Sequence, residues 1–572
     1  MLTTALVIIV LLAALIFSKM KATALFPLAA ACLYVTGEIK QVEVLNNVTN
    51  RSVLTLILLM VASLALERSA IMPWLSSRIF LPSFKATIFR LGLSAAMSSA
   101  FLNNTAVVAT FMASVQRNQE HPSSRLLIPL SYFAILGGTL TLIGTSTNLV
   151  VNALLEDRAL GHLNFLTFTP VGLILLFTVG IAITLSVRTL KDTENVNLQF
   201  AQYFIDAEVQ AQSKLVGNSV RQNGLRALDG LFLAEIVRDN KLISPVTPET
   251  IILAQDKLIF TGDVRHVGQL QHLDGVEVFA DSSHLLETNL TEVIVSPESV
   301  LINRTLKSTD FRSRFDAAVV AISREGQRLS GKLGEQKIQA GDKLVLAVGS
   351  DFSKRQNLSR NFFFISGKQV QQPYSPIQNW IAIGGFIAAI VTSLCSSLTL
   401  LECLVFYIGI LIASQVIDGT TIRRRFPFDL WLILICSLSL AQAFTNSGLA
   451  SWVANQIYQC LGSDVSPYIS LTVIFVITML LTEVITNTAA AAIMLPIGIT
   501  LAQIYSVSFM PFVMAVAYAA SACFISPYGY QTNLMVMNAG GYTFKDFIKT
   551  GWKVSLTYST VAIASIPVFF PF

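Results

Sequence analysis

Apolar segments separated by short polar breaks occupy both ends of the chain, and a long polar stretch lies between them. The apolar segments span residues 2–17, 22–36, 52–67, 86–103, 104–116, 126–154, 168–187, 377–394, 398–416, 428–446, 467–503, 508–536 and 552–570. Segments of this length and apolarity predict helices that cross or enter a membrane. The stretch from 191 to 372 has the polar and strand-like pattern of a soluble insert.

The polar break near the C-terminal end is the most informative one. Residues 481–496 read LTEVITNTAAAAIMLP, so Thr486, Asn487 and Thr488 interrupt an apolar segment. Polar groups at that depth survive only where protein or a watery cavity surrounds them, and they mark candidate functional sites. A helix that begins there directs its free N–H groups and positive dipole end at the Asn-Thr turn. The pattern predicts an anion cradle, and the alternative is a polar kink that serves packing alone.

A second copy of this break lies in the N-terminal half. Residues 101–112 read FLNNTAVVATFM, and a further polar break follows each copy, at 137–149 and at 526–534. Asn104 and Asn148 are 44 residues apart (148 minus 104), and Asn487 and Asn533 are 46 apart (533 minus 487). Two paired breaks at nearly equal spacing indicate an internal duplication, which is typical of secondary transporters.

The predicted crossings give the two halves opposite orientations. Each half has five crossings and one re-entrant hairpin, and an odd number per half makes the repeat inverted. Lys19 and Lys21, Arg188 and Lys191, and the run 423–425 place their loops in the cytoplasm. We therefore expect a multi-pass protein of the plasma (inner) membrane with the insert in the cytoplasm and both termini outside.

Composition agrees with a membrane protein and excludes other classes. The chain of 572 residues is 53% hydrophobic and 13% charged, with a mean hydropathy of +0.63. The net charge of +5 is small and its basic residues lie in loops, so no nucleic-acid partner is expected. Six cysteines lack metal spacing, and five histidines fall in loops or in the polar middle. We expect a lipid-embedded protein that is not an enzyme.

The polar insert contains a repeat of its own. Residues 228–263 align with 315–350, and the shared Asp-Lys-Leu at 256–258 and 342–344 predicts a turn that leads into a strand. The insert lacks a GxGxxG motif, so no complete dinucleotide-binding unit is expected. We divide the chain into 1–188, 189–275, 276–372 and 373–572. The insert is interpreted as a regulatory module for a small ligand or a dimer contact, and the alternative is a passive spacer.

These motifs resemble those of the divalent anion:sodium symporter (DASS) family. Asn103-Asn104-Thr105 and Thr486-Asn487-Thr488 are similar to the Ser-Asn-Thr motif at each hairpin tip of that family, and both replace its leading Ser. Thr482-Glu483 resembles the Thr-Glu before the second motif. The run 144–148 (GTSTN) resembles the broken helix of the sulfate-permease-like branch, whose members carry paired TrkA-C (RCK C-terminal) domains between the halves.

The resemblance implies a fold, a mechanism and a set of site residues. The fold is a membrane all-α inverted-repeat transporter with a soluble α/β insert of two TrkA-C-like domains. The mechanism is an elevator movement in a homodimer, with two sodium ions flanking one inorganic oxyanion. The substrate residues are Asn103, Asn104, Thr105, Thr486, Asn487 and Thr488. The sodium residues are Asn104, Gly144, Thr145, Ser146 and Asn148 for one ion, and Asn487, Ser526, Gly529, Thr532 and Asn533 for the other.

Several functional alternatives remain open at this point. Sulfate is the predicted substrate of a sodium-coupled symporter, and a dicarboxylate is the second. Proton coupling is the rival to sodium, and Glu483 either supports the hairpin or takes part in coupling. A ligand-gated channel and a transporter-like sensor are the readings from other classes, and no TVGYG-like filter loop supports a channel.

Overall fold

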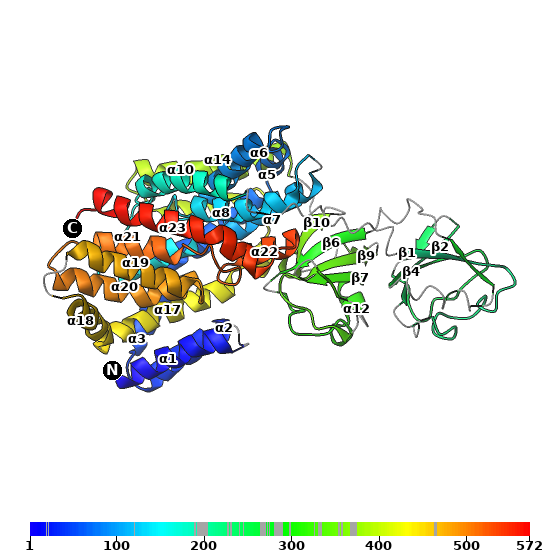
Figure 1. Cartoon of the computed structure of the whole chain (residues 1–572), viewed down its shortest axis with the longest axis horizontal. Helices are drawn as coiled ribbons and strands as arrows, with labels where there is room; N and C mark the ends of the chain where they lie inside the picture. Colours follow the sequence, from blue (N-terminus) through cyan, green and yellow to red (C-terminus); the bar gives the residue numbers. More distant parts are fainter. Residues whose placement is uncertain are drawn as a thin grey trace.

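A computed structural model shows a helical part and two β-sheet units. The structure describes residues 1–18, 20, 22–118, 120–187, 190, 204–225, 228, 231–239, 241–243, 245–262, 270, 273, 275–279, 290–296, 299–324, 327–329, 335–349, 351–352, 355, 358–366, 374–462 and 466–572. Helices gather in one body, and the two sheets extend from it one after the other (Figure 1). This arrangement agrees with the predicted membrane part and soluble insert.

The helices on the two sides of the insert follow the same order. The first series is α1 (Leu2–Phe17), α2 (Ala22–Val35), α3 (Gln41–Val48), α4 (Arg51–Glu67), α5 (Ile71–Ser77), α6 (Phe84–Ser99), α7 (Asn104–Arg117), α8 (Leu127–Gly138), α9 (Ser146–Asp157) and α10 (Thr169–Ser186). The second is α14 (Pro376–Cys395), α15 (Leu400–Ala413), α16 (Gly419–Arg425), α17 (Phe428–Asn446), α18 (Leu449–Leu461), α19 (Pro467–Thr482), α20 (Asn487–Ile504), α21 (Met510–Ala520), α22 (Gln531–Gly540) and α23 (Phe544–Phe569).

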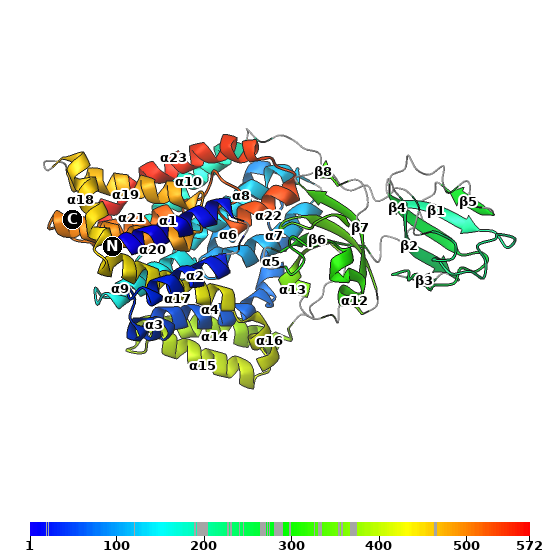
Figure 2. The ribbon, with the colours of Figure 1, turned by 90° about the horizontal axis from the view of Figure 1, so that it is seen from below.

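Equivalent helices also make equivalent contacts. Helix α6 packs on α8 as α19 packs on α21, and α7 packs on α8 as α20 packs on α21. Other contacts cross between the halves, because α2 packs on α17, α15 packs on α4, and α10 packs on α23 (Figure 2). The two halves are therefore interleaved in one hydrophobic core instead of forming two separate bundles.

Five helical segments among the described residues are long and apolar enough to span a bilayer. They are Gln41–Glu67, Thr169–Ser186, Pro376–Cys395, Phe428–Asn446 and Asn487–Ile504. Shorter apolar helices include α1, α2, α15, α19 and α21, each of 11 to 16 residues. A length of about 20 residues is typical for a full crossing, so the short helices suit the hairpins and the interrupted segments.

The polar breaks end earlier than the sequence predicts, at residues 145 and 530 instead of 149 and 534. Helix α8 ends at Gly138 and α9 begins at Ser146, so Asn148 lies in a helical turn and not in the unwound segment. Helix α21 ends at Ala520 and α22 begins at Gln531, so Asn533 is likewise helical. The cause is the same in both places, because each asparagine bonds backward to the carbonyl groups of the break.

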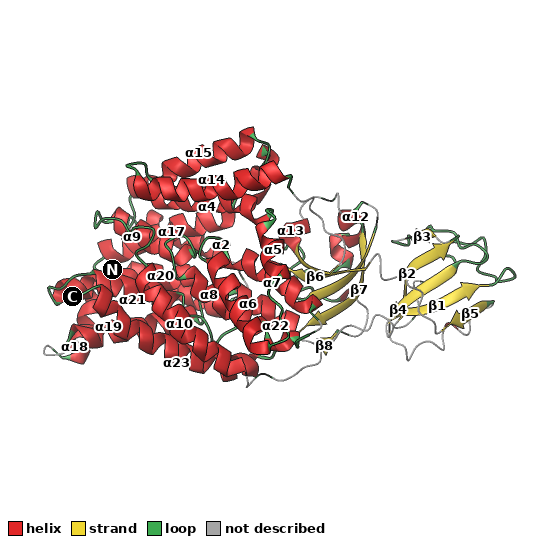
Figure 3. Ribbon diagram, turned by 90° about the horizontal axis from the view of Figure 1, so that it is seen from above, coloured by secondary structure: helices red, strands yellow, loops and turns green. Residues whose placement is uncertain are grey.

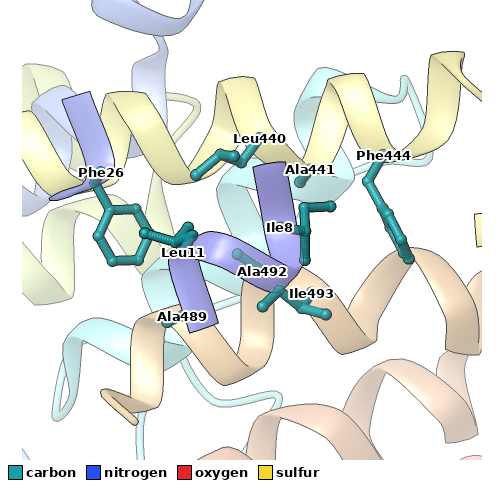
Figure 4. A pocket seen from close by; sticks show the side chains of 9 residues that line it. All are labelled: Ile8, Leu11, Phe26, Leu440, Ala441, Phe444, Ala489, Ala492 and Ile493. Carbon is teal, nitrogen blue, oxygen red and sulfur yellow. The ribbon is translucent and has the colours of Figure 1, made fainter. Parts of the chain in front are cut away.

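A shallow apolar pocket marks the contact between α20 and the N-terminal helices. Figure 4 shows side chains from α1, α2, α17 and α20 around it. Its lining consists of Ile8, Leu11, Phe26, Leu440, Ala441, Phe444, Ala489, Ala492 and Ile493. The alanines of α20 permit the close helix packing that the small-residue run after Thr488 predicts.

The insert consists of two five-stranded antiparallel sheets with one topology. The first contains β1 (Phe204–Val209), β2 (Leu231–Arg238), β3 (Lys241–Ile243), β4 (Lys257–Gly262) and β5 (Val276–Phe279) in the order β3-β2-β4-β1-β5. The second contains β6 (Leu290–Val295), β7 (Ala317–Arg324), β8 (Gln327–Arg328), β9 (Lys343–Val348) and β10 (Phe362–Ser366) in the order β10-β6-β9-β7-β8. Figure 3 shows the strands of both sheets in yellow, and we call the sheets with their loops the first and second unit.

The strand starts that the Asp-Lys-Leu motifs predict are confirmed, since β4 begins at Lys257 and β9 at Lys343. Asp256 accepts two bonds from Arg238 at 2.8 Å, and Asp342 accepts two from Arg324 at 2.8 and 2.9 Å. The hydrogen bond that Arg238 donates to Asp256 raises the pKa of the Arg238 guanidinium. The same ion pair thus fastens the same turn in both units.

The division of the insert at residue 275 needs a correction. Strand β5 pairs with β1 in the register Glu208 to Glu277, so residues 276–279 belong to the first sheet and not to the second unit. Strand β6 begins the second sheet at Leu290. The alignment of 228–263 with 315–350 does not reach this strand, which is the reason for the early boundary.

Replacement of Asp342 by Asn tests the role of the ion pair. The Asp342 side chain is 1% exposed and that of Arg324 is 25% exposed, so loss of the charge should cost the second unit about 2 kcal/mol. Hydrogen–deuterium exchange of β9 in the full-length protein measures the change. Glu249→Gln is the control, because its pair with Arg221 is 68–69% exposed and worth about 0–1 kcal/mol. Equal exchange in both variants would contradict the assignment.

Candidate functional site

The first hairpin tip is a tight turn between α6 and α7. Asn103 caps α7 because its side-chain oxygen accepts the Thr105 N–H at 2.9 Å. Asn104 is 3% exposed, and its side-chain oxygen accepts the Ser99 hydroxyl at 2.5 Å. The amide oxygen of the first helical residue is therefore held by the residue that ends the preceding helix.

The second tip, between α19 and α20, repeats this geometry. The Thr482 hydroxyl lies 2.8 Å from the Asn487 side-chain oxygen and 2.7 Å from the Ala520 carbonyl oxygen, and it shares its proton between them. Thr482 precedes Asn487 by five residues, as Ser99 precedes Asn104. The hydroxyls of Thr486 and Thr488 lie 3.4 Å apart at the start of α20. Both tips thus present an oriented asparagine at a helix N-terminus.

The two breaks are closed by asparagines at identical offsets. The Asn148 amide donates to the carbonyl of Thr141 at 2.8 Å, seven residues earlier, and lies 3.5 Å from that of Gly138, ten residues earlier. The Asn533 amide donates to the carbonyls seven and ten residues before it, those of Ser526 at 3.3 Å and Cys523 at 2.9 Å. Each amide satisfies carbonyl groups that the unwound backbone would otherwise leave without a partner.

A glycine is required at the same place in each break. A β-carbon on Gly144 would lie 2.6 Å from the Gly138 carbonyl oxygen. One on Gly529 would lie 2.6 Å from the sulfur of Cys523 and 2.8 Å from the Thr482 carbonyl oxygen. The residues after these glycines, Thr145 and Tyr530, are both extended, with φ at −139°. The first predicted sodium segment therefore packs tightly on the end of α8, and the second packs tightly on the second hairpin.

The four elements meet across the two halves. The Asn104 amide donates to the Tyr530 hydroxyl at 2.7 Å, and Thr105 donates to the Gln531 side-chain oxygen at 3.4 Å. Helix α7 accordingly packs on α22, and α20 packs on α9. The first hairpin tip is thus in contact with the broken segment of the other half. A β-carbon on Gly138 would lie within 3.2 Å of both Asn104 and the Gly144 carbonyl oxygen, and one on Gly529 would lie 2.8 Å from the Thr482 carbonyl oxygen, so the N-termini of α7, α9, α20 and α22 gather in one region.

Glu483 occupies the second break with both carboxylate oxygens. One oxygen accepts the N–H groups of Phe524 and Ile525 at 3.0 Å, and the other accepts that of Ser526 at 2.6 Å. The Cys523 thiol donates to the carboxylate at 3.4 Å. Three consecutive N–H donors hold the carboxylate in place within the break. The arrangement supports the prediction that Glu483 braces the hairpin over the prediction that it carries protons, and Ala100 is its counterpart in the first half.

Three residues at the site are absent from the predicted set. Thr147 is fully buried, and its hydroxyl has no hydrogen-bond partner among the described residues. Ser131 on α8 lies 2.8 Å from the Thr532 hydroxyl and 2.7 Å from the Asn533 oxygen. Tyr530 bonds the other half, as noted above. Thr147 stands inside the GTSTN run, so sequence reading could have included it, whereas Ser131 has no local signal.

The oxygen-rich composition of this region suits an alkali cation better than a transition metal. No group of three or more His, Cys, Asp or Glu that could hold a metal ion occurs among the described residues. Unwound carbonyls, hydroxyls and amide oxygens are the ligands that transporters offer to sodium. Thr147 supplies a buried hydroxyl oxygen there that has no hydrogen-bond partner among the described residues.

Paired hairpins that meet two interrupted helices inside a helical membrane body define a class, that of the secondary transporters. The chain belongs to the citrate transporter family (CitMHS), whose model matches residues 7–517. It is therefore a membrane transporter and not an enzyme.

The relatives agree with this membership. A putative sulfur deprivation response regulator of Chlamydomonas reinhardtii is 32% identical over 95% of this chain and 97% of its own length. A probable sodium/sulfate cotransporter 3 of the same alga is 27% identical over 63% of this chain and 42% of its own. A sodium-dependent dicarboxylate transporter SdcS of Staphylococcus saprophyticus is 29% identical over 26% of this chain and 28% of its own. The resemblance to DASS-type transporters is confirmed at this level.

Substitution of Glu483 by Gln tests its bracing role. The amide turns an N–H₂ group toward N–H donors that need an acceptor, so we expect a loss of about 2–4 kcal/mol in stability. Thermal unfolding of the detergent-solubilised protein measures it. Glu402→Gln is the control, since Glu402 bonds only the exposed start of α15 among the interactions described. Equal melting of both variants would show that the carboxylate does not brace the break.

Proposed function

We propose that this transporter carries a divalent oxyanion, sulfate, together with sodium ions. The observation that carries the proposal is the meeting of the first asparagine-led hairpin tip with the broken segment of the opposite half, through Asn104 to Tyr530 and Thr105 to Gln531. Four helix N-termini in one region create a positive field without a fixed cation. An anion is the natural ligand of such a field.

The donors at the tips suit an anion that must be released again. A doubly charged anion loses most of its water on entry, and several hydrogen bonds together must offset that cost. Amides and hydroxyls of Asn104, Thr105, Asn487 and Thr488 supply them, with Asn103 and Thr486 at the caps. Neutral donors bind more weakly than an Arg fork does, so they permit release.

Sodium is assigned to the two breaks beside the tips. The first ion lies among Asn104, Gly144, Thr145, Ser146 and Asn148, and Thr147 joins this set because of its unpartnered buried hydroxyl. The second lies among Asn487, Ser526, Gly529, Thr532 and Asn533. The close approach of Gly529 to the Thr482 carbonyl of the second hairpin, and of Gly144 to the Gly138 carbonyl at the end of α8, supports this placement. Both oxygens of Glu483 accept backbone N–H groups, which supports a bracing role for this carboxylate, and proton coupling is the alternative to sodium.

The movement that we propose is an elevator displacement in a homodimer with inverted repeats. The repeated order of helices, with five crossings predicted in each half, supports the inversion. The surface between α20 and helices α1, α2 and α17 is apolar and rich in alanine (Figure 4), which suits sliding. The proposal also includes a plasma-membrane location, a cytoplasmic insert with a TrkA-C-like regulatory role, and external termini.

A dicarboxylate is the second candidate substrate. Relatives of this chain include proteins named sodium-dependent dicarboxylate transporters as well as sodium/sulfate cotransporters. The leading Ser of the family motif is replaced at both tips, by an amide at Asn103 and by another hydroxyl at Thr486. These positions therefore leave the choice between the two substrates open. Tetrahedral and extended anions place their charges at different separations, so competition distinguishes them.

Uptake into proteoliposomes tests the proposal. We expect labelled sulfate to accumulate when sodium is inward-directed, and thiosulfate or molybdate to compete more strongly than succinate. Stronger competition by succinate would favour the dicarboxylate. Passive flux without a sodium requirement would support a channel. Binding without flux would support a sensor. Either result would overturn the proposal.

Alanine variants of the two tip asparagines test the site. We expect Asn104→Ala and Asn487→Ala each to reduce sodium-driven uptake more than about tenfold, since each removes hydrogen bonds to an anion that each contribute about 1.5–3 kcal/mol. Membrane insertion should not change. The control is Asn446→Ala, because Asn446 is exposed and bonds Glu43 away from the tips. Wild-type uptake by both tip variants would refute the assignment.

A further inference from the structure

The two units of the insert share a fold but differ on one face. Position 208 in β1 pairs with 277 in β5 and 257 in β4, and position 294 in β6 pairs with 363 in β10 and 343 in β9. These positions are therefore equivalent, 86 residues apart (294 minus 208). The first unit has Glu208 and Glu277 where the second has Ile294 and Phe363.

The turn before the fourth strand of each unit differs in the same way. Gln255 has φ of 65° and is exposed, whereas its equivalent Gly341 has φ of 84° and is buried. The position two residues later differs in the same way, because Lys257 is exposed and the Lys343 side chain is only 13% exposed, where it pairs with Glu292 at 3.1 Å. One face of the second unit thus carries Ile294 and Phe363 beside a largely buried Lys343–Glu292 ion pair, with no side chain at position 341.

That face is covered by the transport helices. Ile294 is fully buried and belongs to the hydrophobic core of the helical part, and Phe363 packs against the same core. Strand β10 contacts α7, and a β-carbon on Gly341 would lie 2.0 Å from the Asn538 amide nitrogen on α22. Both views of the molecule place this sheet beside α7 and α22 (Figures 1 and 3).

The two helices that it touches are those that begin at the site. Helix α7 begins at the first tip with Asn104, and α22 begins at Gln531, beside Tyr530. Their far ends are joined by a bond from the Gln116 amide to the Ala539 carbonyl at 3.0 Å. The second unit therefore contacts the far ends of the same two helices whose first turns the Asn104–Tyr530 bond joins at the site.

The first unit is connected to this contact through the second. The Arg312 guanidinium lies 5.0 Å from the centre of the Phe232 ring and donates to the Val246 carbonyl. Contacts thus run from the first unit to the second and from there to α7 and α22. The first unit retains the polar version of the face, with Gln255 and Lys257 exposed.

We propose that the face made by Ile294, Gly341 and Phe363 is the coupling surface through which the insert sets the anion affinity of the site. Docking of this face on α7 and α22 holds the two helices in the arrangement that binds anion and sodium. The proposal rests on the proposed function for its readout. It differs from the interpretation of the insert as a passive spacer. A spacer would leave the anion and sodium affinities unchanged when this face is altered.

Gly341→Gln is the sharpest test, because Gln255 shows that the same turn accepts glutamine at positive φ. The new side chain would collide with Asn538 and separate the surfaces. We expect the sulfate and sodium concentrations for half-maximal uptake to rise about fivefold or more, the lower end of typical coupling between sites, with unchanged amounts of protein in the membrane. Gln255→Gly in the first unit is the matched control and should behave as wild type.

Two further variants separate coupling from damage. Asn538→Ala combined with Gly341→Gln removes the colliding amide and should restore part of the affinity. Ile294→Glu with Phe363→Glu copies the first unit and should reproduce the loss without steric collision. Unchanged half-saturation in Gly341→Gln and in the Glu pair would overturn the coupling surface. A wild-type protein without sodium-driven uptake would instead overturn the proposed function, so the two failures are distinct.

Discussion

Every polar backbone group that leaves a helix inside this membrane body needs a partner, and that constraint organises the structure. Two helices are interrupted near the same region, so each exposes carbonyl and N–H groups where no water of the bulk phase is available. Asn148 and Asn533 satisfy the carbonyls with side-chain amides placed seven residues later. Glu483 satisfies three N–H groups in the second break. These three side chains bond the backbone groups that the interruptions expose, and the interruptions are therefore stable in hydrocarbon.

The same constraint explains where the halves differ. Both halves use a hydroxyl five residues before the tip asparagine, a glycine before the restarted helix, and an amide at the same offset. Of the two equivalent positions, only Glu483 of the second half carries a carboxylate, because its equivalent in the first half is Ala100. The tyrosine at 530 likewise replaces Thr145 and reaches Asn104 in the other half. A shared scaffold with unequal contents thus gives two non-identical broken segments beside the hairpin tips.

Local sequence predicts the elements of this protein better than their contacts. The apolar runs predict α14 and α17 nearly to the residue, the run 467–503 covers α19 and α20, and the Asp-Lys-Leu motifs predict the starts of β4 and β9. The predicted ends of the breaks lie too far along the chain. A polar run such as 146–148 is typical of an unwound segment, but here it forms the first turn of α9, and its asparagine bonds backward to the break. The bonds of Ser131 to Asn533 and of Tyr530 to Asn104 join residues about 400 positions apart, which no local pattern contains. The place of β5 depends on pairing across the first unit in the same way.

The interleaving of the halves has a consequence for biosynthesis. Helix α4 packs on α15, and α2 packs on α17, so the early helices meet their partners only after the ribosome has passed residue 400. At roughly 5–20 residues per second, translation of residues 191–372 alone takes about 10–40 s. During that interval the N-terminal helices have only lipid or the insertion machinery to cover their future contact faces. The chain therefore assembles its membrane body late, after the sheets have had time to fold.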